Sequence, residues 1–203
     1  MLIVIGLGNP GREYARTRHN VGFDVIDVLS EKNRIGLTRH AMHGLIGEGF
    51  VDGKKLMLVK PQTYMNLSGQ CVSEIAAFYK PPMDRLLVVY DDIDLPLGRL
   101  RMRAGGSAGT HNGMRSVIGL LGRQDFPRLR VGVGKRPEGW DLGDWVLSSY
   151  QTQEERQTQF DAFLRAADAV EDMLKNGLDS AMRLANAPVE KAGSVGAAKG
   201  VNA

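Results

Sequence analysis

Short apolar runs alternate with helix-like stretches along most of this chain, and this alternation restricts the fold more than any other feature. Residues 2–5 read Leu-Ile-Val-Ile, and a second run at residues 85–90 has Leu-Leu-Val-Val at its centre. Runs of this length and composition are typical of parallel strands that are buried on both faces. Because helical patterns separate the runs, the chain is predicted to fold as an α/β protein.

The remaining elements follow from turns, caps and periodicity. The turn Asp52-Gly53 between two apolar segments indicates a β-hairpin. Further strands are expected at residues 44–50, 55–60, 100–104 and 128–134, and a loop at 137–145. Helices are expected from about residue 20 and at 66–79, 110–121, 152–176 and 178–185. We therefore predict a single domain with a twisted, mixed, mostly parallel central sheet and helices on both faces.

The chain divides into a folded part and a tail. Residues 1–187 have enough apolar side chains for a single core, whereas residues 188–203 are rich in Gly, Ala and Lys. A segment with so little to bury is expected to be a flexible C-terminal tail.

Several cellular contexts are not expected. No run of about 18 apolar residues suggests a membrane span. The N-terminus lacks the basic region and cleavage site of a signal peptide. Cys71 is the only cysteine, so an internal disulfide is impossible and a reducing compartment is natural. We expect a cytoplasmic monomer.

Positive charge is concentrated in one part of the chain. The net charge is only +3, but residues 97–136 contain nine Lys or Arg and a single acid, Asp125. Such a block either binds a polyanion or forms a solvated basic face, and charge alone does not separate the two.

Two literal motif matches point to the wrong chemistry. Gly6, Gly8 and Gly11 spell G-x-G-x-x-G, but the loop runs on to Thr17 instead of opening a helix, as a dinucleotide site requires. Residues 105–109 spell G-x-S-x-G, but the preceding strand alternates with arginines and no histidine follows at a suitable distance. A metal site is not expected either, since His40 and His43 have no ligand cluster around them.

A small set of polar residues lies at the predicted strand and helix ends. Asn9 follows the first strand, Asp91 ends a buried strand, and His19 lies in the long loop between them. A carboxylate at the end of a buried strand needs a partner, and His19 is a candidate. Asn66 and Asn112 begin predicted helices, where they either cap the helix or bind a ligand. In α/β sheets such positions converge at the carboxyl ends of the strands.

Four blocks of sequence carry these residues. They are Gly6-Leu7-Gly8-Asn9-Pro10-Gly11 through Tyr14 to Thr17-Arg18-His19-Asn20, Lys60-Pro61-Gln62-Thr63-Tyr64-Met65-Asn66-Leu67-Ser68-Gly69, Asp91-Asp92-Ile93-Asp94-Leu95-Pro96 with Gly98, and His111-Asn112-Gly113. In this order and at these spacings the blocks resemble the signatures of bacterial peptidyl-tRNA hydrolases. The resemblance covers about residues 2–134, and the long helix after Thr152 also fits.

The resemblance implies an activity and a division of roles. The family hydrolyses the ester that joins a peptide to the terminal ribose of tRNA, and so recycles tRNA from prematurely released peptidyl-tRNA. His19 would act as general base on water, Asp91 would orient its imidazole, and Asn9 would hold the water or the developing oxyanion. Asn66 and Asn112 would bind the peptide main chain. No covalent nucleophile, cofactor or metal is implied.

The resemblance also assigns residues to the pocket wall and to tRNA. Tyr14 and Met65 match positions that line the substrate pocket. Arg103 and Arg130 match basic positions used on the tRNA acceptor end, where arginine offers a bidentate fork for phosphate. Two alternatives remain open at this point: a non-catalytic RNA-binding relative of the same fold, and a general esterase with no RNA requirement.

Overall fold

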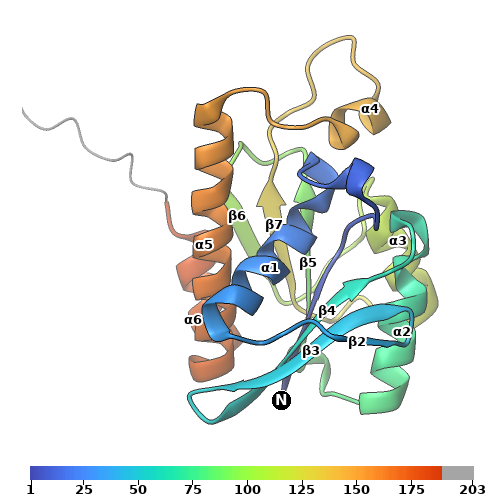
Figure 1. The fold of residues 1–203 in the computed structure, drawn as a ribbon, viewed down its shortest axis with the longest axis vertical. Helices are drawn as coiled ribbons and strands as arrows, with labels where there is room; N and C mark the ends of the chain where they lie inside the picture. Colours follow the sequence, from blue (N-terminus) through green and yellow to red (C-terminus); the bar gives the residue numbers. More distant parts are fainter. Residues whose placement is uncertain (189–203) are drawn as a thin grey trace, which may run out of the picture.

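The computed structural model describes residues 1–188 as one α/β domain built on a seven-stranded sheet (Figure 1). The strands are β1 (Leu2–Gly6), β2 (Arg39–Ala41), β3 (Gly44–Val51), β4 (Lys54–Pro61), β5 (Leu86–Asp92), β6 (Leu100–Arg103) and β7 (Arg128–Gly132). The α-helices are α1 (Val21–Asn33), α2 (Ser68–Tyr79), α3 (Asn112–Leu121), α4 (Leu142–Leu147), α5 (Gln153–Asn176) and α6 (Leu178–Asn186). Short 3-10 turns lie at Arg12–Tyr14, Arg18–Asn20, Met65–Leu67 and Met83–Arg85.

The sheet is mixed, as expected. Its order is β2-β3-β4-β1-β5-β7-β6, with parallel pairing among the four central strands from β4 to β7. The hairpin β3–β4, the short β2 and the edge strand β6 all pair antiparallel. The predicted fold class is confirmed. The antiparallel share is larger than expected because β6 returns beside β7 and β2 extends the hairpin.

Helices cover both faces of the sheet, and alternate residues of each central strand face the two sides. Leu2 and Val4 of β1 belong to the core beneath α1, α5 and α6, whereas Ile3 and Ile5 belong to the core beneath α2 and α3. Figure 1 shows α5 on one side of the sheet and α2 with α3 on the other. This explains why residues 2–5 of β1 and 86–89 of β5 are all apolar, since both faces of these strands are buried.

Two glycines bring the start of α1 against β1. A Cβ on Gly6 would lie 2.1 Å from the carbonyl oxygen of Gly22, and a Cβ on Gly22 would lie 2.4 Å from the backbone of Leu7. No larger residue fits at this crossing. Gly6 of the G-x-G-x-x-G match is therefore needed for packing. The close approach also fixes where the 3-10 turn at Arg18–Asn20, called the His19 turn below, meets the sheet.

Two predicted segments differ from the structure, and a third is not tested by it. The expected loop at 137–145 contains the start of α4, which Asp141 caps by accepting from the backbone N–H groups of Gly143 and Asp144. The helix expected from residue 110 begins at Asn112, because His111 has an extended backbone and caps the helix by accepting from the N–H of Met114. The predicted flexible tail lies outside the described residues apart from its first position.

The other elements lie close to their predicted bounds. The capping box of Thr152 and Glu155 is present at the start of α5, and the helix ends at Asn176 before Gly177. Within residues 1–188, none of the helices combines the length and apolar character that crossing a membrane requires.

Candidate active site

A cavity of about 650 Å³ opens at the carboxyl ends of the central strands. Asn9 follows β1, Asp91 is the last residue but one of β5, and Arg130 belongs to β7. Residues from the α3 side and from α4 close the remaining walls, among them His111 and Val146. The topology therefore collects polar residues from distant parts of the sequence at one edge of the sheet.

Two histidines share one carboxylate at the base of this cavity. His19 Nδ1 lies 2.8 Å from Asp91 Oδ1, and His111 Nε2 lies 2.9 Å from the same oxygen. The Asp91 side chain is 2% exposed, whereas that of His19 is 13% exposed and lines the cavity. The predicted pairing of His19 with Asp91 is present in this geometry, and His111 adds a second donor.

The hydrogen bonds define which nitrogen of each ring carries a proton. The backbone N–H of Met114 donates to His111 Nδ1 at 3.1 Å, so that nitrogen is an acceptor and Nε2–H donates to Asp91. Asp91 also accepts from His19 Nδ1–H, which places the lone pair of neutral His19 on Nε2. His19 can therefore act as a base through Nε2.

The shared carboxylate also changes the pKa values of the site. Burial disfavours the imidazolium of His19, but the charge and hydrogen bond of Asp91 outweigh it and raise the pKa of His19 above its ordinary 6.5. Burial favours the neutral form of Asp91, yet His19 and His111 together lower the pKa of this carboxyl below its usual range. Asp91 is therefore ionised at neutral pH.

Asn9 forms three hydrogen bonds, one with Met65 and two with Asn20. Its side-chain oxygen accepts from the backbone N–H of Met65 at 2.7 Å. Asn20 bonds twice to the Asn9 backbone, accepting from its N–H at 2.9 Å and donating to its carbonyl at 3.0 Å. Because the Asn9 oxygen is occupied, its NH₂ group is the part left for the cavity, which Asn9 lines.

The other predicted pocket residues divide into two groups. Met65, Asn66 and Asn112 line the cavity, and both asparagines are exposed. Neither caps its helix: no side chain caps the turn at Met65–Leu67, and His111 caps α3. Tyr14 does not line the cavity. Its ring packs edge-on against Tyr64 with 6.4 Å between the centroids.

Arginines of β6 and β7 also line the cavity. Arg103 and Arg130 both line it, and Arg130 forms an ion pair with the buried carboxylate of Asp92. Arg128 is 2% exposed and donates to the backbone carbonyls of Ser107 and Gln124. It therefore links the glycine-rich turn at residues 105–109 to the segment before β7. The two predicted tRNA residues are thus neighbours on one wall.

One cluster in the described chain has the composition of a metal site. His19, Asp91 and His111 bring ligand-type atoms within 4.8 Å of one another. The Asp91 oxygen in this cluster already accepts from both imidazoles, so the cluster is satisfied as a hydrogen-bonded set. The absence of a metal stays a prediction.

Comparison with known proteins decides the family. The model of the peptidyl-tRNA hydrolase family matches residues 3–193. The chain belongs to the peptidyl-tRNA hydrolase family. A peptidyl-tRNA hydrolase of Roseiflexus sp. (strain RS-1) is 51% identical over 192 residues, which cover 94% of this chain and 88% of the relative. One from Lachnospira eligens is 50% identical over 186 residues, covering 92% of this chain and all of the relative.

A solved structure agrees with this assignment. The crystal structure of peptidyl-tRNA hydrolase from Acinetobacter baumannii superimposes with a TM-score of 0.86 at 34% identity, over 92% of this chain and 95% of that one. The resemblance drawn from four sequence blocks is therefore confirmed. Each of the four blocks of this peptidyl-tRNA hydrolase family member contributes residues to the cavity.

Sequence reasoning missed four contributors to the site. His111 and Asn20 stand in the quoted blocks, but no pattern shows that they bond to Asp91 and Asn9. Asp92 is adjacent to Asp91, and only the strand alternation places it on the opposite face, beside Arg130. The α4 wall begins within the segment 137–145, for which the sequence predicts a loop.

Proposed function

We propose that this protein hydrolyses the ester between the peptide and the terminal ribose of peptidyl-tRNA, with His19 as general base. The observation that carries the proposal is the arrangement of His19: Nδ1 is bonded to buried Asp91, and Nε2 is left as a base at a cavity with arginines on one wall. A base, an oxyanion donor and a phosphate-binding surface are what this reaction requires.

The reaction follows from these positions. His19 Nε2 takes a proton from water as the water oxygen attacks the ester carbonyl carbon, and Asp91 stabilises the imidazolium that forms. The Asn9 NH₂ group donates to the oxygen that gains negative charge. Collapse of the tetrahedral intermediate breaks the bond to the ribose oxygen, which takes the proton back from His19. The products are tRNA with a free ribose hydroxyl and a peptide carboxylic acid, which releases its proton to solvent and becomes a carboxylate.

Asn66 and Asn112 are proposed to bind the peptide main chain. A side-chain amide offers a donor and an acceptor, so it can pair with backbone whatever the peptide sequence is. Both residues are exposed at the cavity. Within residues 1–188 the only side-chain hydrogen bond of Asn112 is a long one of 3.5 Å, which its oxygen accepts from Arg115. Met65 is proposed to border this peptide region from within the cavity lining, and Tyr14 only through its packing on Tyr64, outside that lining.

Replacing Asn112 by alanine is expected to raise KM for N-blocked aminoacyl-tRNA about 3- to 10-fold with little change in kcat, since one neutral hydrogen bond contributes about 1 kcal/mol. Discrimination against free aminoacyl-tRNA should fall as well. Steady-state kinetics with both substrates measures this. Asn176→Ala, an exposed asparagine at the end of α5, is the control. Unchanged KM and discrimination would remove Asn112 from the peptide site.

Arg103 and Arg130 are proposed to bind phosphate of the tRNA acceptor end. Replacing either by alanine should weaken tRNA binding and reduce the slope of log K against log salt by about one unit, because one fewer counterion is released. Binding titrations at several salt concentrations measure the slope. Arg39→Ala is the matched control, since β2 lies at the opposite edge of the sheet from β6. An unaltered slope in both variants would place tRNA elsewhere.

The protein is proposed to work in the cytoplasm as a monomer without a cofactor. Peptidyl-tRNA supplies the reacting ester, and the side chains of the site supply the base and the donors. The single thiol plays no part, because burial and the nearby Glu74 raise the pKa of Cys71 to about 12. A buried, free thiol fits a reducing compartment.

One experiment separates this function from its alternatives. The protein is supplied with N-blocked aminoacyl-tRNA in ¹⁸O-labelled water, beside a simple ester of the same amino acid. We expect fast turnover of the tRNA ester alone, with the label in the released carboxylate. Tight tRNA binding without turnover would instead show a non-catalytic relative. Equal turnover of both esters would show a general esterase.

A further inference from the structure

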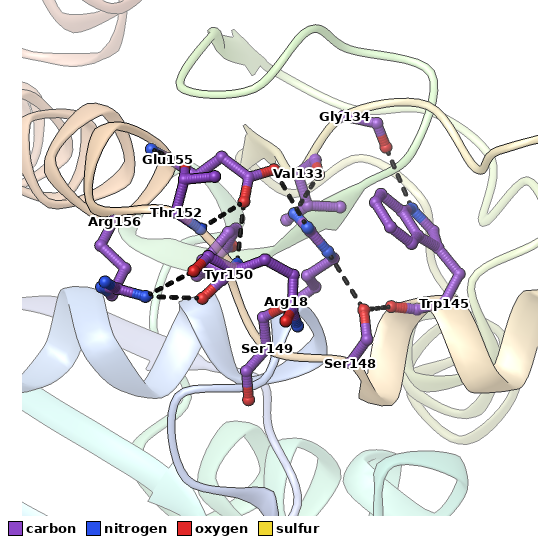
Figure 2. Close-up of polar contacts among 11 residues, drawn as sticks. Arg18, Val133, Gly134, Trp145, Ser148, Ser149, Tyr150, Thr152, Glu155 and Arg156 are labelled. Carbon is purple, nitrogen blue, oxygen red and sulfur yellow. Dashed lines mark hydrogen bonds and ion pairs between the residues drawn. The ribbon is translucent and has the colours of Figure 1, made fainter.

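Arg18, the residue before the proposed base, has its charge buried between two aromatic rings. Its side chain is only 2% exposed. The guanidinium carbon lies 3.9 Å from the ring centre of Trp145 and 4.5 Å from that of Tyr150. Figure 2 shows this guanidinium among residues from distant parts of the chain. Burying a charge costs free energy unless hydrogen bonds and an opposite charge compensate for it. The burial of the Arg18 guanidinium therefore suggests a specific role for this side chain.

The hydrogen bonds of Arg18 reach three separate elements (Figure 2). Nη1 donates to the carbonyl of Val133, just beyond β7, at 3.0 Å. Nε donates to the hydroxyl of Ser148, directly after α4, at 3.3 Å. Nη2 donates to the carboxylate of Glu155 in the first turn of α5 at 3.4 Å. A single side chain therefore joins the His19 turn to the sheet, to α4 and to α5.

Backbone contacts join the same segments. The N–H of Arg18 donates to the carbonyl of Ser148 at 3.0 Å, and Thr17 forms an isolated antiparallel bridge with Ser149. Trp145 is itself anchored, because its indole N–H donates to the carbonyl of Gly134 at 3.2 Å. The end of α4 is thus attached directly to the turn that holds His19.

The segment fastened in this way forms one wall of the cavity. Leu142, Gly143, Val146 and Leu147 of α4 line the cavity, while Trp145 of the same helix contacts Arg18. The helix has six residues, too few to be stable alone, so its position depends on such contacts. Any movement of Trp145 would move the cavity wall as well.

We propose that Arg18 is a positioning residue for hydrolysis, which holds the His19 turn and the α4 wall together as one unit. The inference deepens the proposed function and rests on His19 acting as the base. Arg18 itself touches neither substrate nor reacting atoms. It acts by keeping the imidazole on Asp91 and the wall on the cavity.

The contacts require arginine in particular. A planar guanidinium stacks between two rings and still directs its N–H groups to three acceptors in its plane. Lysine keeps the charge but has neither the flat surface nor the fork. Arg18→Lys therefore removes the proposed function of the side chain while retaining its charge.

We expect Arg18→Lys to lower kcat/KM for N-blocked aminoacyl-tRNA by about 10- to 10²-fold, since small displacements of catalytic groups cost this much. The acid limb of the pH profile should also move to lower pH, because a loosened turn weakens the bond to Asp91 that raises the pKa of His19. Arg156→Met is the matched control. Within residues 1–188 the Arg156 side chain bonds only to the backbone carbonyls of Tyr150 and Gln151, so the variant should leave rate and profile unchanged.

The aromatic partner offers an independent pair of variants. Trp145→Phe keeps a ring against Arg18 and should stay within about threefold of the unaltered rate, whereas Trp145→Leu keeps only apolar bulk and should resemble Arg18→Lys. This pair keeps the proposal testable should Arg18→Lys fail to fold. Trp140 and Trp145 are the only tryptophans, so in a Trp140→Phe background acrylamide quenching reports the position of α4. Quenching should increase in Arg18→Lys.

The results that would contradict the role of Arg18 differ from those that would contradict the proposed function. An unshifted acid limb with unchanged quenching would mean that Arg18 only stabilises the fold, even if activity per mole falls. Equal rates for Trp145→Phe and Trp145→Leu would also overturn the proposal. Failure of the proposed function shows differently, as full activity in His19→Ala. If His19→Ala is inactive and Arg18→Lys is fully active with the ordinary pH profile, only the role of Arg18 is wrong.

Discussion

His19→Ala is expected to lower kcat for N-blocked aminoacyl-tRNA by about 10²- to 10⁴-fold, the usual contribution of a positioned general base. KM should change only a few-fold, because Nε2 acts on the attacking water and the arginine wall remains. Single-turnover kinetics measures the chemical step apart from product release. The loss should be uniform across peptides, since the base does not read their sequence.

The control for this variant is His40→Ala. His40 lies on β2, is exposed, and belongs to the edge of the sheet far from the cavity. It should retain the full rate. A His19→Ala protein that folds normally and turns over like the His40 variant would rule out the mechanism proposed for this family member.

Asp91→Asn is expected to have the second largest effect, a loss in kcat of about 10²-fold or more. The amide carries no charge to stabilise the imidazolium. Both ring donors meet the same oxygen, Oδ1, so in the amide they meet either a neutral oxygen or an NH₂ group that cannot accept from them. The His19 tautomer with its lone pair on Nε2 is then no longer enforced. Stopped-flow kinetics at saturating substrate measures the loss.

The same substitution should move the pH profile in a defined direction. Asp91 raises the pKa of His19, while burial lowers it. Removing the carboxylate leaves the burial effect, so the acid limb of kcat/KM should move to lower pH while the plateau falls. Asp84→Asn, an exposed carboxylate before the opposite end of β5, should change neither. A limb that stays in place or moves to higher pH would contradict the proposed role of Asp91.

Much of the fold could be predicted from the sequence, because local turn and capping signals agree with the tertiary packing. The Asp52-Gly53 turn forms the hairpin of β3 and β4, and the capping box at Thr152 starts α5. The segment 137–145 was misjudged for a physical reason. α4 is short, and contacts with Arg18 and Gly134 hold it, none of which leaves a periodic pattern.

The candidate site could be predicted from the sequence only in part. Strand ends placed Asn9 and Asp91 at one edge, and the family resemblance connected them with His19. The contacts of His111 and Asn20 could not be predicted, since spacing does not reveal which nitrogen of a ring meets which carboxylate oxygen. Tyr14 was placed at the pocket by its motif, but its ring packs on Tyr64 outside the cavity lining.

The most direct test of the central claim compares His19 titration with catalysis. The chain has four histidines, so NMR of the ring protons, assigned with His19→Ala, gives the pKa of His19. The pH dependence of kcat/KM gives the pKa of the essential base in the free enzyme. We predict that the two values coincide and lie above 6.5. An acid limb that does not follow the titration of His19 would show that another group accepts the proton.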